Sequence, residues 1–297
     1  MKKIILTIIL ITAVILPAAA IETGGTFSIG NNNLPAVPST STAFAGDEYP
    51  WGMSLFWKKA ANDVSGIDVG FYKDPILNNI IYTNFYYNED LFNISVGPFF
   101  GVFNTAETLV KSGISTSIRV NIPGFAFAQF DTQSTIGGRL VAAGDYIQEA
   151  NNISLGFYVY NAICTLMINT KSYSAITDAG TSQTEDFTEY AFVTDLFQKN
   201  VPYTIALKLA YQNRVRTLES TSIRSLNNVI LGTDISVSPF EFLSLIIGLE
   251  SGLYSFGSLE NLVADSKDLL SFASELPGSF LFNATLGVSV DLDNINN

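Results

Sequence analysis

The segment 113–122, with the sequence GISTSIRVNI, decides the fold class because its residues alternate in polarity. Ile114 and Ile118 share one face of an extended chain, whereas Ser115 and Arg119 share the other. Alternation with period two is the pattern of a β-strand with one apolar face. A helix with this sequence would spread its apolar side chains around all sides. The segment is therefore predicted to be a strand.

The same alternation recurs along the chain and is clearest at 203–214 and 282–292. In the first of these segments, Leu207 and Leu209 oppose Lys208. The predicted strands, fourteen in all, cover 23–30, 50–58, 66–72, 79–87, 91–103, 113–122, 125–135, 150–160, 162–172, 187–197, 203–216, 227–238, 242–255 and 279–292. An even number of strands is typical of a membrane β-barrel.

The connections between the predicted strands alternate in length. Short turns are predicted at 88–90, 123–124, 161, 198–202 and 239–241. Longer polar loops are predicted at 104–112, 136–149, 173–186, 217–226 and 256–278. Short turns at one end and long loops at the other are typical of a barrel that crosses a membrane. A soluble β-sandwich, the alternative, more often has short turns at both ends and carries more surface charge.

Aromatic residues gather at both ends of the predicted strands, as expected where a barrel crosses two membrane interfaces. Those near the short turns are Tyr86, Tyr87, Phe92, Phe125, Tyr160, Phe197, Tyr203, Phe240 and Phe242. Those nearer the long loops are Trp51, Phe71, Phe100, Phe103, Phe187, Tyr190, Tyr254, Phe280 and Phe282.

The composition agrees with a barrel in lipid. Only 14% of the 297 residues are charged, against roughly 25% in an average soluble protein. There is no histidine, which excludes histidine-based catalysis and histidine metal ligands. The single cysteine, Cys164, is predicted on an apolar face as an inert small side chain. The net charge of −12 argues against nucleic acid as a partner.

The first twenty residues are predicted to be a signal peptide that is cleaved near Ala20. Lys2 and Lys3 precede the apolar segment 4–16, and small residues follow it at 17–20. That apolar run is short for a membrane-spanning helix, which needs about 20 residues. The chain is thus divided into a signal peptide, 1–20, and a barrel, 21–297.

A late segment, 258–276, has helical rather than strand spacing. Leu259, Leu262 and Leu269 recur at helical intervals, and Pro277 follows the segment. We predict one short helix in an external loop, with a helix folded into the lumen as the alternative.

Function is expected on the polar face that lines the lumen. The predicted pore-lining residues are Lys58, Arg119, Asp131, Lys208, Asp234 and Glu250. Four of them, Arg119, Asp131, Lys208 and Asp234, are predicted at similar middle depth. They form either a charged constriction that selects solutes by sign and size, or an internal salt-bridge network. Facing Lys or Arg to lipid at this depth would cost roughly 2–4 kcal/mol, which favours the inward placement.

No residue pattern indicates catalysis, a cofactor site or a metal site. Asp131 and Asp234 could form a carboxylate pair, but no motif singles them out. Acidic residues in predicted loops, among them Asp178, Glu185 and Asp186, are interpreted as solvated charges rather than calcium ligands. The chain is therefore expected not to be an enzyme.

The chain from 21 to 297 resembles Gram-negative-type outer-membrane β-barrels, by architecture and not by a motif. Among fourteen-stranded members of that class it is closer to monomeric porins than to fatty-acid transporters. The transporters carry a plug before their first strand, whereas only Ile21 and Glu22 precede one here. The chain lacks the terminal aromatic residue of many such barrels. Its composition, which is rich in Ile, Asn and Phe and poor in Cys, resembles that of barrels from spirochaetes.

The sequence thus predicts an all-β, antiparallel, up-and-down transmembrane barrel of about 14 strands, with 10 to 12 as the alternative. The resemblance implies a porin-like channel in the outer membrane, with membrane lipid and small solutes as its partners. Two alternatives stay open. One is a closed barrel that displays its loops for adhesion or assembly. The other is a transporter of an apolar ligand, for which Phe56, Phe99 and Ile246 on the inner face are a hint.

Overall fold

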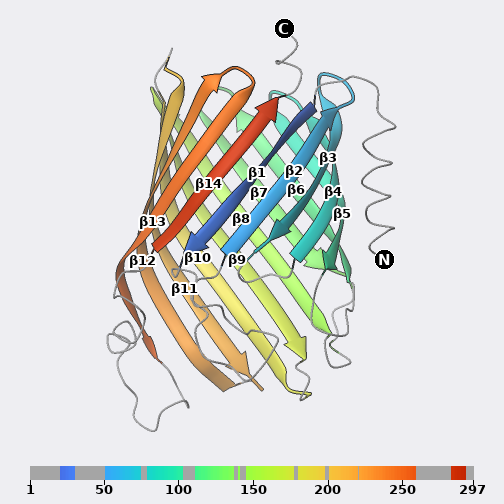
Figure 1. The fold of residues 1–297 in the computed structure, drawn as a ribbon, viewed down its shortest axis with the longest axis vertical. Coiled ribbons are helices and arrows are strands. Elements are labelled where there is room, and N and C mark those ends of the chain that lie inside the picture. The colour runs from blue at the N-terminus through green and yellow to red at the C-terminus, as the bar shows by residue number, and fades with distance from the viewer. Residues whose placement is uncertain are drawn as a thin grey trace.

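The described residues form a closed antiparallel β-barrel of fourteen strands in a computed structural model of the chain (Figure 1). The structure describes residues 21–30, 51–74, 79–102, 111–136, 140, 145–176, 180–197, 201–219, 221–258 and 282–291. Each strand pairs with its neighbours in sequence, and the first pairs with the last to close the sheet. At the closure Thr26 lies opposite Gly287.

The strands fall into a short set and a long set. The short strands, of 9 to 11 residues, are β1 (Ile21–Gly30), β2 (Trp51–Ala60), β3 (Ser65–Lys73), β4 (Asn79–Asn88), β5 (Phe92–Val102), β6 (Ser112–Ile122), β7 (Ala126–Thr135) and β14 (Phe282–Asp291). The long strands, of 14 to 20 residues, are β8 (Tyr146–Val159), β9 (Ala162–Ile176), β10 (Ser182–Phe197), β11 (Tyr203–Leu218), β12 (Thr221–Phe240) and β13 (Leu243–Ser258).

All fourteen predicted strands are confirmed, each overlapping one observed strand. The described residues contain no helix long and apolar enough to cross a membrane. The predicted signal peptide, 1–20, and nearly all of the predicted helix 258–276 lie outside the described residues; Ser258 itself ends β13.

Two predicted loops are wrong, because the structure continues as strand through most of them. The predicted loop 173–186 contains the end of β9 and the start of β10, and 217–226 contains the end of β11 and the start of β12. In these extensions both faces carry polar residues, so the apolar alternation that marks a strand is lost. Side-chain hydrogen bonds join them instead, as between Ser174 and Thr184 at 2.9 Å.

The two faces of the sheet differ sharply in polarity. Ile118 on β6, Phe130 on β7 and Ile153 on β8 are register partners whose side chains are exposed on the outer surface. Their chain neighbours Arg119 and Asp131 point into the lumen, where they meet other polar side chains. The predicted face assignment of 113–122 is therefore confirmed.

The long strands β8 to β13 extend one side of the barrel beyond the other strands, and we call this side the tall wall. In Figure 1, β10, β11 and β12 reach farther down than β1, β2 and β14. We call that lower end the loop end and the opposite end, with connections such as 61–64 and 123–125, the turn end. The extra length of about five residues, at about 3.3 Å per residue, corresponds to roughly 16 Å of strand.

A row of polar residues crosses the outer face of β6 to β12 on the turn-end side of this extension. Its members, which we call the polar row, are register partners: Thr116, Thr132, Asn151, Thr170, Thr188, Asn213 and Asn227. On the turn side of the row the outer face is apolar, as at Leu155 and Leu166. On the loop side the outer face of β9 and β10 is polar, as where Ser172 donates to Asp186 at 2.7 Å, whereas on β6 the outward Ile114 is 50% exposed.

The turn end carries exposed aromatic side chains, as predicted. Phe125, Tyr160, Phe197, Tyr203 and Phe240 are all exposed there. Two members of the predicted aromatic girdles belong to the other face. Tyr86 lies inside, beneath the Lys58 ammonium, and Phe187 is buried on the inner wall. Alternation explains both positions. Tyr86 directly follows the exposed Phe85, and Phe187 is three residues before the exposed Tyr190, so each lies on the opposite face from its neighbour.

Large aromatic side chains on the inner wall lie over glycines. Phe99 is fully buried, and a Cβ built on Gly113 would fall 2.1 Å from its ring. Tyr146, also fully buried, covers Gly101 in the same way and stacks on Tyr173. Glycine is required here because the ring occupies the space of its missing side chain. Phe99 therefore packs into the wall, where it offers little surface to an apolar ligand.

Candidate pore lining

All six predicted pore-lining residues lie on inward-facing positions of the barrel. Arg119 and Asp131 are on the adjacent strands β6 and β7. A second group, Lys208, Asp234 and Glu250, lies on β11, β12 and β13. The strands β8 to β10 separate the two groups. The predicted carboxylate pair of Asp131 and Asp234 is therefore not brought together.

Lys208 is the centre of an ion network on the inner wall. Its ammonium lies 2.8 Å from Glu189 on β10 and 2.8 Å from Glu250 on β13. Glu189 also accepts a hydrogen bond from the Gln212 amide at 2.6 Å. The network thus crosses four neighbouring strands, and both carboxylates neutralise one cation.

Gly232 on β12 makes the reach from β11 to β13 possible. It lies between Lys208 and Glu250 in the register. A Cβ on Gly232 would approach the Lys208 Cβ and the Glu250 Cγ to 3.3 Å each. A side chain at this position would therefore stand between the two charges. Asp234, two residues further along β12, has no hydrogen bond or ion pair within the described residues and is exposed.

Asp131 is held by hydrogen bonds from neutral side chains rather than by a cation. Ser117 donates to Oδ1 at 2.5 Å, and Asn152 donates to Oδ2 at 2.9 Å. The Gln129 amide lies 2.9 and 3.0 Å from the two oxygens. Hydrogen bonds of this kind satisfy a carboxylate without an ion pair.

Arg119 lies on the turn-end side of Asp131 and packs against an aromatic ring. Its guanidinium carbon is 3.7 Å from the centroid of Phe127, a close cation–π contact. It also donates to Asn121 Oδ1 at 2.8 Å and to the Tyr158 hydroxyl at 3.2 Å. Lys58 makes a similar contact on the opposite wall, with its ammonium 4.9 Å from the Tyr86 centroid.

Two contacts cross the lumen near the loop end, and neither is predictable from the alternation of the sequence. The Tyr72 hydroxyl on β3 donates to the Gln133 Oε1 on β7. The Lys171 ammonium on β9 forms an ion pair with Asp74, which follows β3. Alternation along β9 places Lys171 on the inner face, but a partner six strands away cannot be read from alternation. We call these two contacts the cross-lumen bridges.

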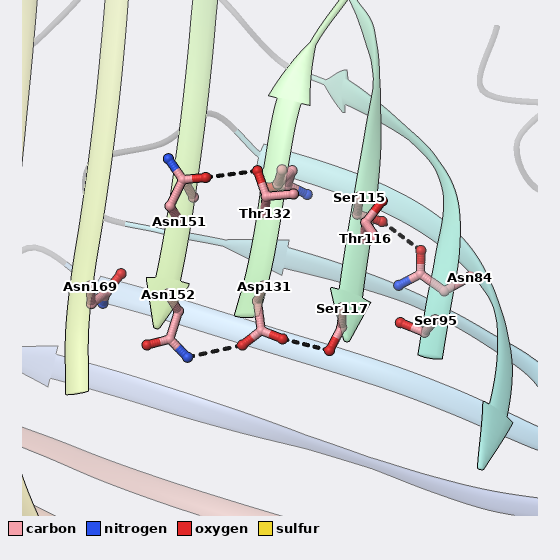
Figure 2. A pocket seen from close by; sticks show the side chains of 12 residues that line it. Asn84, Ser95, Ser115, Thr116, Ser117, Asp131, Thr132, Asn151, Asn152 and Asn169 are labelled. Carbon is pink, nitrogen blue, oxygen red and sulfur yellow. Dashed lines mark hydrogen bonds between the residues drawn. The ribbon is translucent and has the colours of Figure 1, made fainter. Parts of the chain in front are cut away.

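A polar recess of about 220 Å³ lies on the inner wall between β4 and β9. Figure 2 shows Asp131 between Ser117 and Asn152, and Asn84 turned toward Ser115. The residues that line it are Asn84, Ser95, Ser115, Thr116, Ser117, Asp131, Thr132, Gln133, Ala150, Asn151, Asn152 and Asn169. Asp131 is the one charged residue among them.

Toward the loop end, the wall formed by β14, β1 and β2 is lined by small residues, whereas toward the turn end it also carries Glu22, Phe56, Lys58 and Asp291. Thr26 is hydrogen-bonded to Ser54 at 2.7 Å, and Gly287 lies beside Thr26 in the register. The inward positions of these strands include Gly24, Thr26, Ser28, Gly52, Ser54, Thr285, Gly287 and Ser289.

Acidic side chains outnumber basic ones inside the barrel. Among inward strand positions with described side chains, the acids are Glu22, Asp68, Asp131, Glu185, Glu189, Asp195, Asp234, Glu250 and Asp291. The bases are Lys58, Arg119, Lys171, Lys208 and Arg214. The sum is 5 − 9 = −4, so the described lumen has a net negative charge.

Comparisons with known proteins give similarities of architecture alone. No protein-family model and no curated protein matches the chain. A bacterial polysaccharide outer-membrane secretin is similar over 93% of this chain and 99% of its own, with 7% identity and a TM-score of 0.47. OmpT of Vibrio cholerae covers 93% and 99%, with 7% identity and a TM-score of 0.43. An anion-selective porin from Comamonas acidovorans covers 92% and 99%, with 9% identity and a TM-score of 0.38.

Proposed function

We propose that this chain is a porin-like channel that spans an outer membrane and lets small polar solutes pass through its lumen. The observation that carries the proposal is the closed barrel with an apolar outer face and a polar inner face. Such a barrel satisfies its backbone hydrogen bonds without free strand edges, as a structure in lipid must. Export by the predicted signal peptide, 1–20, is part of the proposal.

The strand lengths support a membrane-spanning placement. A tilted strand needs about 9–11 residues to cross the hydrocarbon layer, and the short strands have 9 to 11. The long strands exceed this length, and their outer face changes to polar at the polar row. We therefore place the membrane boundary of the loop end at this row, so that the tall wall projects into water.

The inner wall supports passage rather than catalysis, and we assign the chain no enzymatic role. Barrels of about 8 strands are filled by side chains, whereas barrels of 16–18 strands leave an aqueous channel. With fourteen strands, the open space depends on the lining. The small-residue wall of β14, β1 and β2 provides the path, and the net negative charge of the described inward positions favours cations over anions.

The test is single-channel recording of the purified protein in planar bilayers. We expect discrete conductance steps and, under a KCl gradient, a reversal potential that shows preference for K⁺ over Cl⁻. Insertion without conductance would contradict the channel. Failure to insert, with a soluble β-rich monomer instead, would contradict the membrane placement.

A second candidate function is a closed barrel that displays its tall wall and loops for adhesion. The cross-lumen bridges favour it, because the Tyr72–Gln133 and Asp74–Lys171 contacts narrow the lumen near the loop end. Stable insertion without conductance is the result that would support this function over the channel.

A further inference from the structure

The polar recess offers hydrogen-bonding groups and almost no free charge. Ten of the twelve residues that line it carry a hydroxyl or amide side chain, from Ser95 and Asn84 on one side to Asn169 on the other. Amides and hydroxyls both donate and accept hydrogen bonds. A ligand that matches this surface must do the same with several closely spaced groups.

The one carboxylate of the recess is already occupied. Asp131 accepts hydrogen bonds on both oxygens from Ser117, Gln129 and Asn152. A cation that entered would have to displace these donors. Asp131 therefore orients the neighbouring amides, and an anionic ligand would be repelled by its charge.

Apart from Thr116, which belongs to the polar row of the outer face, two polar side chains of the recess have no partner of their own. Asn169 on β9 and Ser95 on β5 have no hydrogen bond or ion pair among the described residues. They lie at opposite sides of the recess, with the Asp131 cluster between them (Figure 2). Both are therefore available to a ligand that lies across the cluster.

Other inward side chains limit the recess along the barrel axis at both of its ends. Toward the loop end, Gln133 is bound by Tyr72, and Lys171 is the next inward residue after Asn169. Toward the turn end, Arg119 lies against Phe127. The recess therefore lies between the cross-lumen bridges and the Arg119 cluster.

The volume sets the size of the ligand. About 220 Å³ is below the roughly 300–1,000 Å³ of pockets for drug-sized ligands. It holds about seven water molecules at roughly 30 Å³ each. A single sugar ring displaces water on this scale and replaces its hydrogen bonds.

We propose that the polar recess is a binding subsite for an uncharged, hydroxyl-rich solute of the size of one sugar ring. The proposal rests on the proposed channel, of which the recess is one wall. It goes beyond general passage because it names a solute class and a place where that solute pauses.

The test uses saturation-transfer NMR on the purified protein in detergent micelles, with D-glucose as the probe. Binding is read without conduction, so this result is separate from the test of the channel. We expect saturation of glucose ring protons, and weaker saturation of D-glucuronate because its carboxylate meets the charge of Asp131. Asn169→Leu should weaken glucose binding about tenfold by removing a hydrogen-bonding group and filling space.

The matched control is Thr170→Leu, which adds leucine next to Asn169 on β9 but on the outer face, away from the recess. It should bind glucose as the wild type does. Equal loss in both variants, or no saturation in the wild type, would overturn the subsite. A wild type that conducts but does not bind glucose would leave the channel standing without this subsite.

Discussion

At the scale of single residues, Lys208 best connects structure to function. It holds two carboxylates, Glu189 and Glu250, at 2.8 Å each. Glu189 is 5% exposed, whereas Lys208 and Glu250 are each about a fifth exposed. The lysine thus reduces the negative charge of the lumen and compensates two partly buried acids.

Lys208→Gln should therefore make the channel more selective for cations and the barrel less stable. The inward charge of the described positions changes from −4 to −5, and two carboxylates lose their cation. We expect a loss of about 2 kcal/mol, below the roughly 3–5 kcal/mol of a fully buried pair, because the network is partly solvated. Reversal potentials in a KCl gradient and urea unfolding in lipid vesicles measure the two effects.

The control for this substitution is Lys73→Gln, which removes a cation from the outer face of β3. It should leave the reversal potential unchanged. If both variants shift the reversal potential equally, the effect of Lys208 comes from overall charge and not from the lumen.

At the scale of the element, the outer face of β9 changes from apolar to polar residues along the strand. Leu166 and Thr170 are both on its outer face, four residues apart, and Leu166 is 54% exposed. Leu166 lies on the apolar part of the outer face, on the turn side of the polar row, whereas Thr170 belongs to the row. If the row marks the membrane boundary, the same charge should have different costs at the two positions.

Leu166→Arg should destabilise the barrel by roughly 2–4 kcal/mol in lipid, and Thr170→Arg by roughly 0–1 kcal/mol. The free energy of unfolding from lipid vesicles measures the difference. Because both variants introduce arginine, each serves as the control for the other. Equal costs at both positions would place the boundary elsewhere, and the polar row would then have no relation to the membrane.

The elements also show how far the sequence predicts the structure. Alternation located every strand, because an apolar outer face and a polar lumen face produce period two. It failed at the ends of β9 to β12, where the outer face is polar as well, and Ser172 and Asp186 look like loop residues. It placed Lys208 and Arg119 inside correctly, yet it could not pair Lys171 with Asp74, because barrel curvature brings them together.

At the scale of the whole molecule, the barrel is uneven in height and in lining. Its tall wall, β8 to β13, carries Lys208 and its partners, while β14, β1 and β2 are short and lined by small residues. The cross-lumen bridges join β3 to β7 and β9, so they divide the loop end into a narrowed part and a more open part. Passage should follow the small-residue wall.

This division predicts the effect of removing the Asp74–Lys171 bridge. Lys171→Ala shortens a side chain that reaches across the lumen, so single-channel conductance should rise. Asp74→Asn keeps the bulk of the bridge but removes its charge attraction, so its increase should be smaller. Lys73→Ala, on the outer face near the same end, should leave conductance unchanged.

If Lys171→Ala conducts as the wild type does, the bridge lies outside the path. If the wild type is closed and only Lys171→Ala conducts, the bridge is the closure, and the barrel is a channel held shut across its lumen.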